Sequence, residues 1–129
     1  MIELHARDIA TLNKASSAAL KAAGVKATDA PKPTTGQVDI IEQITDRHAI
    51  MLSRSTRGSM LNLGESLLIY EVSPAPFAAL AANEAERVAP NTTLVDLQES
   101  GGTGKLYLSG NKALLERVRQ QIDKVLNTV

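Results

Sequence analysis

The clearest periodic pattern in the chain lies near its C-terminal end. Between residues 112 and 127, large apolar residues recur every three or four positions, which is the spacing of one helix face. They are Leu114, Leu115, Val118, Ile122, Val125 and Leu126. A shallower pattern of small and apolar residues runs from Ile9 to Ala23, and Gly24 follows where helices often end in a left-handed residue. The two patterns predict one amphipathic helix near each end of the chain.

Between these helices the pattern changes to extended runs. Residues 67–70 form a continuous apolar run, typical of a central strand that is buried on both faces. Residues 93–98 and 105–109 predict two further strands, and the glycine-rich segment between them fits a hairpin loop. Residues 38–44 and 48–53 predict another hairpin or a bent pair of strands.

One more helix is predicted in the middle of the chain. Ser73 supplies an N-cap and Pro74 a first-turn proline, and the helix then continues to Ala89, where Pro90 ends it. Residues 27–37 contain prolines, threonines and a glycine but no large apolar residue, which is the composition of a linker. We therefore expect an N-terminal helical extension over 1–26, a linker over 27–37 and a domain over 38–129.

The order of elements predicts the fold class. From residue 66 the order is strand, helix, strand, strand, helix, and a ferredoxin-like sheet would need one more strand after the last helix. An additional strand is instead predicted in front, over 48–53. We therefore predict an α+β fold: an antiparallel ferredoxin-like sheet with helices packed on it, in circularly permuted strand order, preceded by the N-terminal helix.

Composition excludes several classes of function. Lys plus Arg and Asp plus Glu number fourteen each, so no net charge attracts nucleic acid or an anionic membrane. The absence of cysteine excludes disulfides, thiolate catalysis and cysteine-ligated metals, and it fits a reducing compartment such as the cytoplasm. His5 and His48 lack metal-ligand spacing, and no nucleophile, base and orienting group occur together. We expect no enzyme, no cofactor and no metal site.

The amino-acid sequence of residues 66–127 resembles the shell-protein domain of bacterial microcompartments. The matching segments are SLLIYEVSPAPFAALAANEAERVAP, TTLVDLQ, ESGGTG, KLYLSG and NKALLERVRQQIDKVL. The strand order resembles the circularly permuted branch found in ethanolamine- and propanediol-utilization shells. The resemblance extends over about residues 38–127, and no single motif in it is diagnostic.

The resemblance implies a structural subunit of a microcompartment shell. Such subunits form cyclic hexamers, or trimers when two domains are fused, and these tiles pack into sheets around metabolic enzymes. Its partners would be further copies, other shell proteins and encapsulated enzymes, and its location a shell in the cytoplasm. The hairpin that would line the central pore for small metabolites consists of Glu99, Ser100, Gly101, Gly102, Thr103 and Gly104. Arg87 occupies the position of a lysine that the family places at the tile edge.

Other interpretations of these residues stay open. The glycine-rich segment also fits a plain hairpin turn without a ligand, and Arg87 also fits a solvated arginine paired with Glu84 or Asn83. Residues 2–26 resemble either a remnant half-repeat of the strand-helix unit or a tethered docking helix. The rival function is an oligomeric ferredoxin-like regulatory module. It would bind a small effector through the glycine loop and the basic run Arg47, Arg54 and Arg57.

Overall fold

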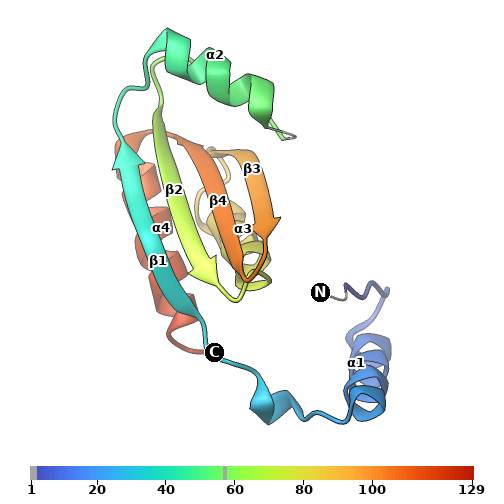
Figure 1. Cartoon of the computed structure of the whole chain (residues 1–129). Coiled ribbons are helices and arrows are strands. Elements are labelled where there is room, and N and C mark those ends of the chain that lie inside the picture. Colours follow the sequence, from blue (N-terminus) through green and yellow to red (C-terminus); the bar gives the residue numbers. More distant parts are fainter. Residues whose placement is uncertain (1–2, 57) are drawn as a thin grey trace. The chain divides into compact units, whose positions relative to one another are not determined.

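The computed structural model describes residues 3–56 and 58–129, and it divides into two compact units, Met1–Pro31 and Lys32–Val129 (Figure 1). The first unit contains helix α1 (Ile9–Ala23) and a 3₁₀ turn (Ala27–Asp29). The Asp8 carboxylate caps α1 by accepting from the Thr11 amide at 2.8 Å. Gly24 ends it in the left-handed region with φ 71°. The predicted helix and its glycine cap are confirmed.

The second unit is an antiparallel sheet with helices on both faces. Its strands are β1 (Thr34–Ile41), β2 (Ser66–Ser73), β3 (Thr93–Ser100) and β4 (Thr103–Gly110), in the order β1-β2-β4-β3. Helices α3 (Phe77–Val88) and α4 (Lys112–Leu126) cover one face, and α2 (Asp46–Ser55) lies across one end of the other (Figure 1). This is the predicted α+β class. In the described part of the chain, no helix combines the length and apolarity needed to cross a bilayer.

Strand β2 separates two hydrophobic clusters. Leu68, Tyr70 and Val72 point to the face covered by α3 and α4, where they join Leu106 and Leu108 of β4. On the opposite face a smaller cluster forms beneath α2, and it consists of Ile44, Ala49, Leu61, Leu67 and Val95. Because β2 contributes to both clusters, its continuous apolar run is explained, and the predicted central strand is confirmed.

The predicted strand over 48–53 is wrong, because these residues lie in helix α2. Ala49 is buried, Leu52 and Ser53 are half-buried, and their three-and-four spacing is helical. Asp46 in the first turn and Arg54 in the last turn further stabilise the helix through its dipole. A short apolar run does not by itself distinguish a helix from a strand.

Strand β1 takes the place in the sheet that the sequence pattern predicts for residues 48–53. It pairs antiparallel with β2, from Thr34 opposite Ser73 to Ile41 opposite Leu67. Residues 34–37, which the pattern places in the linker, belong to this strand. They are exposed at the sheet edge, so no apolar alternation marks them in the sequence.

Helix α3 begins later than predicted. Ser73 does not cap it, because Ser73 is still paired with Thr34 in the sheet. Its hydroxyl instead donates to the Gly102 carbonyl oxygen at 3.1 Å. The helix starts at Phe77, after Pro76.

A buried tyrosine links the sheet to α4. The Tyr70 hydroxyl donates to the Asp123 carboxylate at 2.7 Å, and the Thr35 hydroxyl lies 3.2 Å from it. Arg119 contacts the other Asp123 oxygen at 3.4 Å. Burial is the main cause that raises the pKa of Tyr70 from 10.0 to about 12, and the hydrogen bond to Asp123 adds to it.

Tyr70→Phe tests this link. The variant leaves the Asp123 carboxylate short of one donor, so at pH 7 we expect a loss of about 1–2 kcal/mol in the free energy of unfolding. The folded-state pKa of Tyr70 lies above its ordinary value, so Tyr70 stabilises the fold below pH 10, and this contribution is lost as the pH rises toward 12. Urea unfolding at pH 7 and pH 11 should therefore show a smaller gap between wild type and variant at pH 11.

Tyr107→Phe is the control at pH 7, because none of the described hydrogen bonds involves the Tyr107 hydroxyl. Equal stability of wild type and Tyr70→Phe at pH 7 would contradict a role for the Tyr70 hydroxyl.

Candidate functional site

Most of the predicted glycine-rich loop belongs to the β3–β4 hairpin ladder. Glu99 pairs with Gly104 and Ser100 with Thr103, so the turn itself is only Gly101 and Gly102. Gly101 has φ 61°, a conformation that glycine adopts without strain. Residues 99–102 are exposed and Thr103 is half-buried. The hairpin therefore ends in a narrow tip with almost no side-chain volume.

The tip is attached to the junction between β2 and α3. The Gly102 carbonyl oxygen accepts from the Ala75 amide at 2.9 Å and from the Ser73 hydroxyl at 3.1 Å. Ser73 and Ala75 lie at least 27 positions earlier in the chain, and they hold the turn through its backbone. This attachment fixes the direction in which the hairpin leaves the sheet.

Gly104 has a different role from the other glycines of the hairpin. It is buried, and a Cβ atom at this position would lie 2.5 Å from the Ala78 Cβ and 2.6 Å from the Ala75 carbonyl oxygen. The close approach of β4 to the start of α3 therefore requires glycine. At Gly102, by contrast, an added Cβ would meet no atom within 4 Å.

Glu99 is the charged residue nearest to the turn along the chain. Lys105, further along β4, is already paired with Glu71, with 3.1 Å between Nζ and Oε2. The hydrogen bond to Glu71 raises the pKa of Lys105. Within residues 3–56 and 58–129 no ion pair involves Glu99. Each hairpin therefore presents a carboxylate, the Ser100 hydroxyl and backbone amide groups to solvent.

Arg87 lies in the last turn of α3, at a distance along the chain from the hairpin. Its side chain is 70% exposed, and Nη1 donates to Glu84 Oε1 at 2.8 Å. Glu84 is only 10% exposed at its side chain, and its other oxygen lies 3.4 Å from Gln121 Nε2 of α4. The pairing of Arg87 with Glu84, which was one of the open interpretations, is present, and the guanidinium remains accessible.

The sequence predicts Glu84 only as a partner of Arg87, and its burial beside Gln121 of α4 is not predicted. It follows Leu80 and Ala81 at helical spacing and so lies on the inward side of α3, between the two helices. The signal that could have found it is a carboxylate within an apolar stripe, three residues before an arginine.

The remaining sequence candidates belong partly to the first unit and partly to the second. His5 contacts Glu3 at 2.9 Å in the exposed N-terminal segment, and Asp8 caps α1. Over residues 3–56 and 58–129, no three His, Asp or Glu side chains group in a way that could hold a metal ion. Arg47 and Arg54 are exposed on α2, whereas Arg57 lies outside the described residues.

The chain is similar to curated proteins over most of its length. No protein-family model matches the chain. Carboxysome shell protein CcmP of Synechococcus elongatus is 38% identical over 112 residues, which cover 87% of the chain and 52% of that protein. Carboxysome shell protein CsoS1D of Prochlorococcus marinus is 34% identical over 131 residues, covering 98% of the chain and 51% of that protein. The chain spans about half the length of these curated relatives.

Two solved structures are similar to the chain over nearly its whole length. The double ringed trimeric shell protein MSM0271 from the RMM microcompartment superposes with a TM-score of 0.91 at 43% identity, covering 97% of the chain and 61% of that protein. The fused permuted hexameric shell protein MSM0275 from the same microcompartment gives a TM-score of 0.85 at 36% identity, covering 94% of the chain and 61% of that protein.

Gly104→Ala tests the packing of the hairpin on α3. We expect a loss of about 1–3 kcal/mol in the free energy of unfolding, because the new methyl group overlaps Ala75 and Ala78. Gly102→Ala is the matched control, since its methyl group meets open space and its φ is not in the left-handed region. Chemical denaturation of both variants measures the difference. Equal stability of the two would contradict the close contact at Gly104.

Proposed function

Because the chain belongs to the shell proteins of bacterial microcompartments, in their circularly permuted form, we propose that it is a structural subunit of such a shell. The observation that carries the proposal is the 43% identity and TM-score of 0.91 to a solved shell protein. The relatives described above are named as shell proteins, which favours a structural over an enzymatic role. The comparisons give no support to the alternative of a ligand-binding regulatory module.

The assembly that we propose is a closed ring of six domains, formed as a hexamer or pseudohexamer. One solved relative is described as hexameric and another as a double ringed trimer. A ring uses the same two surfaces on every subunit, so a single chain is sufficient to close it. By the same analogy, we extend the proposal to two rings per particle. Other shell proteins and encapsulated enzymes would be its partners in a shell in the cytoplasm.

In this ring we place the β3–β4 hairpins around the axis, where they would line a pore. Three features support the placement: the tip has no bulky side chain, its direction is fixed by Ala75 and Ser73, and residues 99–102 are exposed. Residues 99–102 are the exposed part of the predicted pore-lining segment, while Gly104 would support it from inside the fold.

The chemistry of such a pore follows from the groups at the tip. Six copies would gather six Glu99 carboxylates, six Ser100 hydroxyls and the backbone amides of the glycines. A ring of carboxylates raises the local concentration of cations and repels anions. We therefore propose that the opening favours cationic and neutral polar metabolites over anionic ones.

Arg87 remains our proposal for the tile edge. The guanidinium has five N–H donors in a planar fork, and Glu84 takes only one of them in this structure. The remaining exposed donors are available to backbone carbonyls of a neighbouring tile.

Ser100→Cys tests the position of the hairpins in the ring. The chain contains no cysteine, so the new thiol is unique. If the hairpins meet at an axis, a short bis-maleimide should convert most chains to covalent dimers, and the yield should not change on tenfold dilution. Denaturing gel electrophoresis measures the yield, and the same reaction in denaturant is the control. A dimer yield that falls with dilution would instead indicate random collisions and would contradict the placement.

Arg87→Ala tests the tile edge, with Glu84→Gln as its matched control. Both variants remove the Arg87–Glu84 ion pair, but only Arg87→Ala removes the exposed guanidinium. We expect both to form rings, and only Glu84→Gln to form extended sheets or tubes in electron micrographs. If Arg87→Ala forms sheets as Glu84→Gln does, Arg87 does not belong to the tile edge. Loss of sheets in both variants would indicate that the Arg87–Glu84 pair acts only within the fold.

A further inference from the structure

The exposed apolar side chains of the second unit are concentrated at one place. They are Ile50 and Met51 of α2 and Met60 and Leu63 of the following segment, with exposed fractions of 50, 70, 76 and 62%. Outside this group, the only large apolar residue of residues 32–129 described as exposed is Val129, near the C-terminus. We call these four residues the α2 patch. An apolar cluster of this kind on a small domain is typical of an interaction surface.

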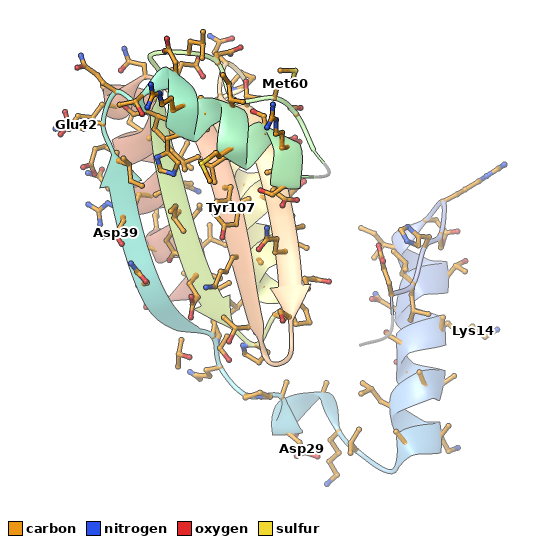
Figure 2. The ribbon with its side chains drawn as sticks, turned by 45° about the horizontal axis from the view of Figure 1, so that its top comes forward. Lys14, Asp29, Asp39, Glu42, Met60 and Tyr107 are labelled. Carbon is orange, nitrogen blue, oxygen red and sulfur yellow. The ribbon has the colours of Figure 1, made fainter. Side chains whose placement is uncertain are left out.

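Contacts within the fold explain why the inner residues of this region are buried, but they do not explain the exposed apolar residues on its outer side. Leu61 is buried beneath α2, and its amide donates to the Ser53 hydroxyl at 3.2 Å, which holds residues 60–63 alongside the helix. Met60 lies beside α2, at the end of the sheet opposite the β3–β4 hairpin (Figure 2). The α2 patch therefore faces away from the core that it flanks.

The charges around the α2 patch match those of a second copy of the same surface. Asp46, Ile50 and Arg54 are exposed and follow one another at four-residue spacing, so they form one ridge along α2. In the described part of the chain, no ion pair involves Asp46 or Arg54. The ridge thus has an acidic end, an apolar centre and a basic end.

If a twofold axis passed beside Ile50, each group of this ridge would meet a complementary group on the second copy. Two antiparallel copies of α2 would bring Ile50 against Ile50, and Asp46 of each copy against Arg54 of the other. The two charges are eight residues apart, about 12 Å along a helix axis, so both pairs form at once. An interface of this kind is self-complementary, as a contact between identical subunits must be, and the antiparallel helix dipoles also attract.

We propose that the α2 patch joins two rings of this chain, through antiparallel pairing of α2 helices across twofold axes. The inference rests on the proposed ring and names the contact that pairs the rings. With the hairpins at the ring axis, the α2 patch lies at the other end of each sheet, away from the axis (Figure 1). Twofold contacts between two rings close the assembly, so that the particle contains two rings and does not grow into a fibre.

Charge reversal on the ridge is the sharpest test, with the whole chain and light scattering of the purified particle. Asp46→Arg and Arg54→Asp each place like charges opposite one another at both ends of the pair, so each should halve the particle mass. The double variant Asp46→Arg with Arg54→Asp restores opposite charges and should restore the wild-type mass. Failure of the folded double variant to do so would overturn the antiparallel pairing.

A second pair of variants does not depend on the helix ends, where charge reversal also opposes the helix dipole. Met51→Asp should halve the particle mass, whereas Val129→Asp, an equally drastic change at a comparably exposed apolar site outside the patch, should not. Circular dichroism of each variant checks that the fold is retained.

The outcomes separate this inference from the proposed function. Wild-type particles with the mass of one ring, or two-ring particles that Met51→Asp leaves intact, would overturn the pairing surface and leave the ring standing. A wild-type monomer would overturn the ring itself. Binding of wild-type single rings to phosphatidylserine vesicles, abolished by Met51→Asp, would assign the α2 patch to an anionic membrane and overturn the inference.

Discussion

The contact between the base of the β3–β4 hairpin and the start of α3 determines where the hairpin tip lies at the surface of the fold. Gly104 packs directly on Ala75 and Ala78, and the Gly102 carbonyl oxygen accepts from Ala75 and Ser73. A glycine turn left to itself would have many conformations. Here a helix, a strand and the turn share one small contact, and the exposed tip is a fixed feature that identical copies can align around an axis.

The two ends of the sheet have opposite chemistry, and this separates their proposed roles. One end carries the polar hairpin tip with Glu99 and no apolar bulk, which suits a hydrated opening. The other end carries the α2 patch, which contains most of the exposed large apolar residues of the second unit, and a balanced pair of charges, Asp46 and Arg54. Because both ends belong to one sheet, a single subunit can form a pore at one end and a contact with an identical copy at the other.

Much of this fold follows from the sequence because its core elements have full periodic signals. Strand β2 is buried on both faces and α4 has an uninterrupted stripe, so both are predicted correctly. Sequence patterns do not predict the elements whose conformation depends on tertiary contacts. Residues 48–53 are too short a run to reveal a helix, and residues 34–37 form an edge strand without apolar alternation. For the site, the sequence predicts the hairpin, but the close packing of Gly104 depends on a neighbouring helix that no local pattern reveals. The burial of Glu84 is indicated only by its place in the apolar stripe of α3.

The central claim is that identical copies form a ring with the β3–β4 hairpins at its axis. A cryo-electron microscopy reconstruction of the purified particle, made without imposed symmetry, tests it most directly. We expect six domains around a closed ring, with the density of residues 99–104 surrounding the central opening. A reconstruction in which these hairpins lie on the outer rim, or a particle too small to contain a ring, would contradict it.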